Sequence, residues 1–195
     1  QSMAHNAVEE AWSVRVFDIG QGLSVLVRQH NRFLLYDTGQ SFISGGNLAQ
    51  SVIAPYFEAK AHFISRESHI KNTVPSIDYL INSHMDNDHA GGNAFVFSRY
   101  NVTQWLTPAG GCTSNDSFTW GDLSLQMLWP DKTVSGEENN HSCVIKISGK
   151  NLSLLLTGDI EAAAERLILN KYADLGTLQA DVLVAAHHGS KTSST

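Results

Sequence analysis

Short apolar runs alternate with polar, glycine-containing connections along most of the chain, a pattern that predicts β-strands separated by turns. The first two predicted strands, 13–18 and 23–28, are separated by Gly20-Gln21-Gly22, which favours a tight hairpin turn. Further apolar runs predict strands at 32–37, 77–83, 103–106, 123–128, 143–147, 151–157 and 181–185.

Helical periodicity interrupts the strand pattern. In 47–60 the apolar side chains share one face, although Pro55 predicts a kink or an early end to that helix. Helices are also predicted at 93–100 and at 160–172, the latter rich in alanine, glutamate and leucine. Strands followed by helices, without a repeat or linker, indicate one β-rich domain of mixed α/β (α+β) class.

The length and net charge of the chain bear on its domain count and on the partners it could bind. With 195 residues, of which 42% are hydrophobic, the chain can bury a core as one domain. We expect this domain to span 12–195, after a tag or disordered leader at 1–11. No apolar run approaches the roughly 20 residues that cross a bilayer. The net charge of −6 argues against a broad basic face for nucleic acid, but bound metal could neutralise several carboxylates beside such a substrate.

The densest chemistry lies in the segment 84–89, where two imidazoles and two carboxylates follow an apolar run. These groups belong to His84, Asp86, Asp88 and His89. Transition metals are bound by imidazole and carboxylate ligands that converge from a short loop. A solvated polar loop is the alternative, and four such groups directly behind an apolar strand argue against it. The segment therefore predicts a metal site.

Matching chemistry follows other predicted strands. Asp37, Asp159 and the pair His187-His188 each come at the end of an apolar run. Each signal alone also suits an ordinary turn. Together they would place many ionisable groups on one rim, where like charges repel unless cations are bound.

The order of these motifs resembles that of the metallo-β-lactamase-fold hydrolases. From about Trp12 onward, the chain is more closely similar to the C-terminal domain of ComEC-type DNA-internalisation competence proteins. The resemblance implies a four-layer αββα sandwich with its site at one edge between the sheets, and further closing elements beyond residue 195. It rests on Phe17-Asp18-Ile19-Gly20-Gln21-Gly22, Leu35-Tyr36-Asp37-Thr38-Gly39, Ser83 to Gly92, Asn139 to Val144, Leu156-Thr157-Gly158-Asp159 and His187-His188-Gly189-Ser190.

The resemblance also implies metal ligands. His84 and Asp86 would hold one metal ion, Asp88 and His89 would hold the other, and Asp159 would bridge the two. One histidine of the pair at 187–188, which we assign as His188, would complete the second site.

Other roles lie around these ligands. Asp88, His187 and His188 are the expected catalytic residues, and Asp37 would orient a ligand imidazole from the second shell. Ser190 and Lys191 could contact a substrate phosphate, or they could form a solvated loop.

Two positions depart from the wider fold. Asp86 stands where a histidine is common, so the first site is richer in oxygen, which favours Mn²⁺ and leaves Zn²⁺ or Mg²⁺ possible. His141 is the candidate for a further ligand before the bridging aspartate, or else it is a substrate-side or solvent-facing imidazole.

The two cysteines, Cys112 and Cys143, lack the spacing of a metal or redox motif, which leaves free thiols or one disulfide open. The resemblance places the domain outside the cytoplasm, where a disulfide would persist. On that ground we expect the bond.

Two metal ions can activate water and clamp the oxygens of a phosphodiester. The resemblance therefore implies a metal-dependent nuclease that degrades the non-transported DNA strand during uptake. Its partners would be single-stranded DNA and the membrane-channel portion of the same polypeptide. The domain would be a soluble part of a cytoplasmic-membrane protein, facing the periplasm or exterior. Without the resemblance, the residue types and their spacing support only the general prediction of a metal-dependent hydrolase. A non-catalytic DNA-guiding domain and a hydrolase of a small phosphoester or thioester remain open.

Overall fold

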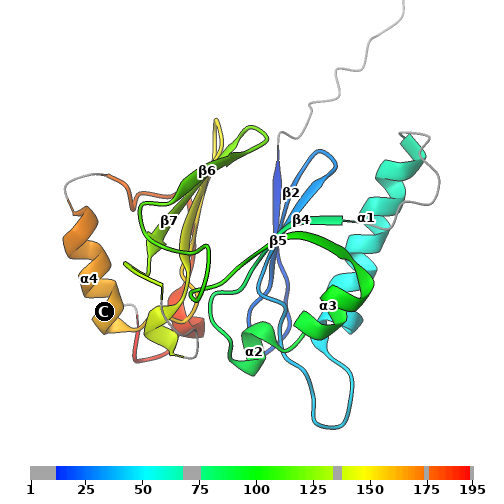
Figure 1. Ribbon diagram of the computed structural model, residues 1–195, viewed down its shortest axis with the longest axis horizontal. Helices are drawn as coiled ribbons and strands as arrows, with labels where there is room; N and C mark the ends of the chain where they lie inside the picture. The colour runs from blue at the N-terminus through cyan, green and yellow to red at the C-terminus, as the bar shows by residue number, and fades with distance from the viewer. Residues whose placement is uncertain (1–11, 68–75, 134–137, 174–175, 194–195) are drawn as a thin grey trace, which may run out of the picture.

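The computed structural model describes residues 12–67, 76–133, 138–173 and 176–193. The predicted leader 1–11 lies outside these ranges. Two five-stranded sheets face each other, with α1 and α3 covering the outer face of one and α4 the outer face of the other (Figure 1). The expected four-layer αββα sandwich is confirmed. Among the described residues, no helix has the length and apolar character needed to cross a membrane.

The first sheet has the order β1-β2-β3-β4-β5. β1, β2 and β3 pair in antiparallel fashion, whereas β3, β4 and β5 run parallel. Parallel strands share one direction, so the carboxyl ends of β3, β4 and β5 lie along the same edge. The strands are β1 (Ser13–Val16), β2 (Val25–Gln29), β3 (Arg32–Tyr36), β4 (Ser76–Ile81) and β5 (Asn101–Leu106).

The second sheet has the order β10-β9-β8-β7-β6. Its strands pair in antiparallel fashion except for β10 and β9, which are parallel. β6 was not among the strands that the sequence predicted. The strands are β6 (Ser117–Trp120), β7 (Leu123–Trp129), β8 (Val144–Ser148), β9 (Ser153–Leu156) and β10 (Val182–Val184).

Three apolar clusters hold the layers together. The largest fills the space between the sheets and includes Val25, Tyr36 and Leu125, all fully buried. A second lies between the first sheet and its helices, around Phe57, and a third lies between the second sheet and α4. The strands β2, β3 and β9 therefore bury side chains on both faces, which explains why their sequences are nearly continuous in apolar residues.

The helices differ in detail from the prediction. A π-helical turn, Ala49–Ile53, precedes α1 (Ala54–Glu67). The π-helical turn runs directly into α1, since Ala54 N donates to Ala49 O. The helix therefore does not stop at Pro55 but continues to Glu67, and the π turn just before the proline is a local change of hydrogen bonding at the position where its N–H is missing. The other helices are α2 (Asn87–Ala90), α3 (Asn93–Arg99) and α4 (Ala162–Tyr172), with short 3₁₀ turns at Asn139–His141 and Ala186–Gly189.

The connection between β1 and β2 also differs from the prediction. It is an eight-residue loop, 17–24, rather than a tight turn around the glycines. Gly22 has a φ of +109°, and a Cβ there would overlap the backbone carbonyl of Asp88. Leu23 N also donates to Asp88 O over 3.3 Å. The glycine-containing loop therefore supports the segment 84–89, which carries the predicted metal ligands and is called the metal-motif segment below, instead of closing a hairpin.

A disulfide joins the two sheets below that segment. Cys112 follows β5 and Cys143 precedes β8, with a Cα–Cα distance of 5.9 Å that suits the bond. Tyr36, at the end of β3, donates its hydroxyl to Cys143 O over 2.7 Å. The expected disulfide is confirmed.

Candidate metal centre

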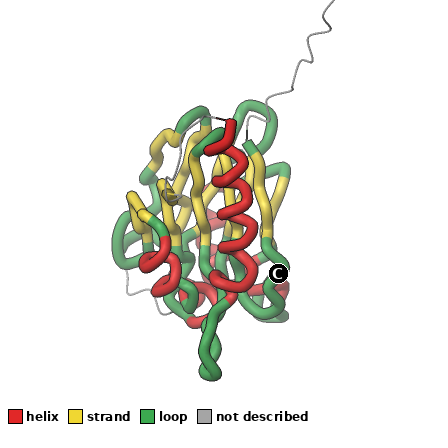
Figure 2. Tube along the Cα trace, turned by 90° about the vertical axis from the view of Figure 1, so that its right-hand side faces the viewer, coloured by secondary structure: helices red, strands yellow, loops and turns green. Residues whose placement is uncertain are grey.

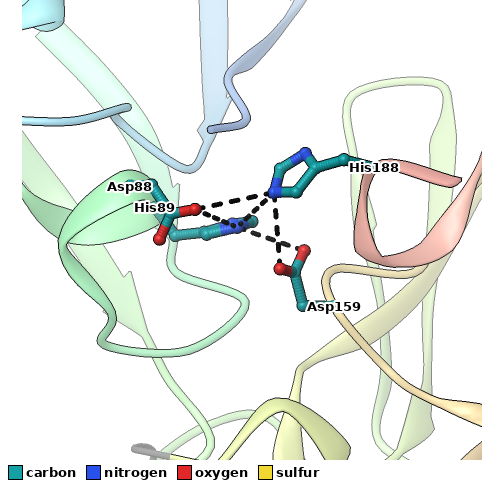
Figure 3. A group of neighbouring side chains, drawn as sticks. All are labelled: Asp88, His89, Asp159 and His188. Atoms are coloured by element: carbon teal, nitrogen blue, oxygen red, sulfur yellow. Dashed lines mark hydrogen bonds and ion pairs between the residues drawn. The ribbon is translucent and has the colours of Figure 1, made fainter. Parts of the chain in front are cut away.

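The ionisable groups meet at the edge of the sandwich, where the carboxyl ends of two parallel strand pairs face each other. Asp37 follows β3 and the segment 84–89 follows β4, whereas Asp159 follows β9 and the pair at 187–188 follows β10. Figure 3 shows Asp88 and His89 reaching in from one side and Asp159 and His188 from the other. The site is therefore built from both sheets.

Asp88, His89, Asp159 and His188 form a compact group, each offering a ligand atom within 4.8 Å of all the others. His89 Nε2 lies 3.1 Å from Asp159 Oδ1 and 3.3 Å from His188 Nε2. His188 Nε2 lies 3.4 Å from Asp159 Oδ2 and 3.6 Å from Asp88 Oδ2. Tetrahedral ligands at about 2.1 Å from zinc are about 3.4 Å apart. The spacing therefore matches the ligands of one metal ion.

Asp37 and Ser83 fix how the ligand imidazoles face this group. The buried Asp37 carboxylate accepts hydrogen bonds from Ser83 N and Ser83 Oγ, each 2.7 Å long. Its Oδ2 also lies 2.8 Å from His89 Nδ1, so that nitrogen carries the proton. Because Ser83 Oγ donates its hydrogen to Asp37, it must accept a hydrogen bond from His84 Nδ1, 3.0 Å away. In the neutral form of both imidazoles the proton is therefore on Nδ1, and Nε2 has a lone pair for a cation.

These Nε2 atoms fit a metal ion better than any protein partner. His84 Nε2 is buried without a hydrogen-bond partner, and so is Asp159 Oδ1. The 3.1 Å approach of His89 Nε2 to Asp159 Oδ1 is within ion-pair range but is not an aligned hydrogen bond. Two acceptors at this distance repel unless a proton or a metal ion lies between them. The donor set is thus suited to a divalent cation.

Electrostatics of the group favour positive charge. Burial opposes protonation of His89, but the carboxylates of Asp37 and Asp159 outweigh burial and raise the pKa of His89 to about 10. Burial likewise opposes ionisation of Asp159, but the close approach and charge of His89, with the charges of His188 and His84, lower the pKa of that carboxyl. Burial, followed by the charge of His89, lowers the pKa of His84. His84 therefore stays neutral, as a metal ligand must.

His84 and Asp86 form a second pair beside this group. The rings of His84 and His89 have centroids 4.3 Å apart, and His84 Nε2 lies 3.5 Å from Asp86 Oδ2. The His84 side chain is fully buried, whereas that of Asp86 is 49% exposed. The compact group does not include this pair, so a second metal ion held by His84 and Asp86, with Asp159 as the bridge, stays a prediction.

The two consecutive histidines after β10 point in different directions. Their φ angles, +47° for His187 and +52° for His188, lie in the left-handed region that residues with a Cβ seldom adopt. This backbone turns His188 into the compact group. His187 Nδ1 instead lies 2.9 Å from Thr192 Oγ1 and 3.5 Å from Glu161 Oε1, with its Nε2 3.9 Å from Asp159 Oδ2. The geometry thus brings His188, the histidine assigned as a ligand, into the compact group and leaves His187 outside it.

The remaining predicted residues lie around this centre. His141 is in the 3₁₀ turn Asn139–His141, its Nε2 3.6 Å from Glu138 Oε2, and the compact group does not include it. Ser190 Oγ lies 3.2 Å from Thr192 Oγ1, and Lys191 is exposed. Ser190 and Lys191 remain predictions as phosphate contacts.

Sequence reasoning gave no role to several residues that support the centre. Ser83 was quoted only as the first residue of a motif, although its hydroxyl links both ligand imidazoles to Asp37. Thr38 binds the backbone oxygen of His89 through N and Oγ1, at 2.7 and 3.1 Å. Ser142 Oγ accepts from Asp159 N over 3.1 Å. The available signal was that each of these small hydroxyl residues is adjacent in sequence to a predicted site residue.

Comparison with known proteins agrees with this geometry. The family model described as the metallo-beta-lactamase superfamily matches residues 17–195. The chain belongs to this superfamily. A solved member, Rm3 metallo-beta-lactamase, superposes with a TM-score of 0.54 at 16% identity, covering 91% of this chain and 78% of that one. At that identity the superposition shows the shared fold alone.

Within the superfamily, the chain is homologous to part of much longer competence proteins. It is 37% identical to Recombination protein 2 of Haemophilus influenzae, covering 93% of this chain and 22% of the relative. It is 34% identical to Competence protein ComA of Neisseria gonorrhoeae, covering 95% of this chain and 25% of that protein. The chain thus spans about a quarter of the length of these relatives. The resemblance to competence proteins is confirmed.

Proposed function

We propose that this superfamily member is a metal-dependent phosphodiester hydrolase that cleaves a DNA strand during DNA uptake. The observation that carries the proposal is the position of His89 Nε2, which Asp37 holds from the other ring nitrogen and which lies 3.1 Å from the buried Asp159 Oδ1 of the opposite sheet. Kinship with part of competence proteins supplies the DNA context. The charge of −6 is consistent with a substrate bound through cations rather than through a basic face.

Metal ions would be held by His84 and Asp86 on one side and by Asp88, His89 and His188 on the other, with Asp159 between them. Two divalent ions supply Lewis acidity and lower the pKa of water to near neutrality. The oxygen-rich donor set favours Mn²⁺, with Zn²⁺ or Mg²⁺ as alternatives.

The other proposed roles, which are to orient the ligands, transfer a proton and bind the substrate phosphate, fall to side chains of the protein. Asp37 and Ser83 fix the Nδ1 protons of the ligand imidazoles, so that Nε2 is the atom that would lose its proton, where it carries one, and bind a metal ion. His187 is held through Nδ1 by Thr192, beside Glu161, so its Nε2 is placed to hold or deliver a proton at the leaving oxygen. Ser190 and Lys191 follow His188 and are proposed to contact the substrate phosphate.

A metal-replete cleavage assay tests the proposal. Single- and double-stranded oligonucleotides and a small diester, bis(4-nitrophenyl) phosphate, would be offered with Mn²⁺, Mg²⁺ or Zn²⁺. We expect Mn²⁺-supported DNA cleavage that Asp88→Ala abolishes, since that change removes a charged ligand. His141→Ala should retain most activity, and Glu138→Ala is a control outside the compact group.

Each alternative has its own outcome. DNA binding without cleavage under any ion would favour a DNA-guiding domain. Hydrolysis of the small diester or of a thioester without DNA cleavage would favour a small-molecule hydrolase. Cleavage that survives Asp88→Ala would place the activity elsewhere.

A further inference from the structure

A hairpin with an apolar tip projects from the end of the molecule that carries α2, as Figures 1 and 2 both show. It comprises residues 41–47, between β3 and the π-helical turn, and is called the 41–47 hairpin below. Ile43 is fully exposed and the Phe42 side chain is 42% exposed. Two neighbouring apolar side chains at a projecting tip form a small apolar surface that is available for binding.

Backbone hydrogen bonds hold the hairpin in a defined conformation. Ser41 and Asn47 form an antiparallel bridge. Phe42 N donates to Gly46 O over 3.0 Å, and Gly45 N donates to Phe42 O over 2.9 Å. Gly45 and Gly46 adopt φ angles of +93° and +86°, which the turn requires and glycine allows. The tip residues are therefore held in place by the backbone.

The base of the hairpin is clamped to the metal-motif segment. Ser41 Oγ donates to Asn87 Oδ1 over 2.6 Å, and Asn87 Nδ2 donates back to Ser41 O over 3.0 Å. A Cβ at Gly91 would overlap Ser41 N, so the two segments are in close contact. Asn87 immediately precedes Asp88, a member of the compact group. The position of the tip is thus fixed relative to the candidate metal centre.

From these observations we infer that Phe42 and Ile43 contact the faces of unpaired nucleobases in the DNA strand bound at the metal centre. The inference rests on the proposed function and adds a base-binding element to it. Base faces are flat and apolar, and stacking on protein side chains is independent of sequence. Apolar side chains of this kind also insert between base steps. A duplex buries these faces, so the hairpin selects single strands or frayed ends.

A lipid surface is the competing partner, and the hairpin suits it less well. Residues 39–48 contain no Lys or Arg, whereas binding to anionic lipid relies on clustered basic residues. Two apolar side chains alone give at most marginal membrane attachment. Attachment to lipid also does not require a fixed position of the tip relative to the metal centre, whereas the hydrogen bonds between Ser41 and Asn87 fix that position.

The test replaces both tip residues by serine. The variant Phe42→Ser/Ile43→Ser is compared with Leu167→Ser/Leu169→Ser, which removes two similarly exposed apolar side chains from α4. The readout is the ratio of kcat/KM for a single-stranded oligonucleotide to kcat/KM for bis(4-nitrophenyl) phosphate. We expect the ratio to fall about tenfold in the hairpin variant, as loss of one stacking contact implies, and to be unchanged in the α4 variant. Phe42→Trp should retain it.

A second readout does not depend on cleavage. A 2-aminopurine oligonucleotide would be titrated with the chain carrying Asp88→Ala, with and without the serine changes at the tip. Fluorescence quenching that disappears with the tip supports the inference, and equal quenching and an unchanged ratio overturn it. Co-sedimentation with phosphatidylglycerol vesicles that is lost with the tip, while DNA binding is kept, would assign the hairpin to lipid. If no phosphodiester is cleaved but tip-dependent quenching remains, the hydrolase proposal fails and the base-binding element stands.

Discussion

Asp37 orients both ligand imidazoles, so replacing it by asparagine tests the logic of the centre with almost no change in shape. The carboxylate accepts from Ser83 N, Ser83 Oγ and His89 Nδ1 at 2.7, 2.7 and 2.8 Å. In the Asp37→Asn variant, one carboxylate oxygen becomes an NH₂ group. That NH₂ group would face His89 Nδ1, which donates to Asp37 in the unaltered chain. To accept a hydrogen bond from the new NH₂ group, Nδ1 must lose its proton, so the neutral imidazole would carry its proton on Nε2. The protonated Nε2 cannot bind a metal ion.

The magnitude follows from the bonds that are lost. A hydrogen bond to a charged group contributes about 1.5–3 kcal/mol. Loss of the His89 bond should therefore weaken metal binding about 10- to 100-fold, which is also the usual effect of removing a partner of a ligand histidine. Isothermal titration with Mn²⁺ would measure the change, and circular dichroism would confirm that the metal-free variant is folded.

Asp131→Asn is the matched control, because it removes the same charge from a half-exposed carboxylate that pairs with Lys171. It should leave metal affinity unchanged. If Asp37→Asn binds metal as tightly as the unaltered chain, the tautomer argument is wrong. A loss of similar size in both variants would instead indicate a long-range effect of net charge.

Other changes probe the surroundings of the centre. Replacing Cys112 and Cys143 by alanine opens a loop with a sequence separation of 31, which should cost about 4 kcal/mol of unfolding free energy in urea titrations; an unchanged midpoint would contradict this. Because the pKa of His89 is raised to about 10, that imidazole is protonated below this pH, and metal must displace the proton. Affinity should then fall about tenfold per pH unit toward acid, and calorimetric enthalpies should vary with the buffer. Gly22→Ala should weaken metal binding more than Gly20→Ala, since both have positive φ but only the first lacks space for a Cβ.

The fold was largely predictable from the sequence because its inner strands bury both faces and appear as continuous apolar runs. β6 escaped prediction because its four residues, Ser117–Trp120, include a serine and a threonine and lie at the sheet edge. The early end expected at Pro55 was wrong, because the helix continues to Glu67. A π-helical turn directly precedes the proline, and apolar periodicity does not indicate such a local change in hydrogen bonding.

The candidate site was predictable as a set of residue types and less so as an arrangement. Acidic and imidazole groups at the ends of apolar runs were sufficient to bring Asp88, His89 and Asp159 together. The resemblance was enough to assign His188 rather than His187 as a ligand, but the left-handed backbone that separates the two side chains is not indicated by the local sequence. The part of Ser83 depends on which hydrogens its neighbours donate, and hydrogen-bond direction emerges only in three dimensions.

The division of the compact group between the two sheets has a consequence for how the chain matures. Asp88 and His89 precede Asp159 and His188 along the chain and follow strands of the other sheet. A nascent chain with only its first sheet complete would hold half of the group. On the proposal that the group binds a cation, binding would wait until the second sheet has docked, and an occupied group would indicate that the sandwich is assembled.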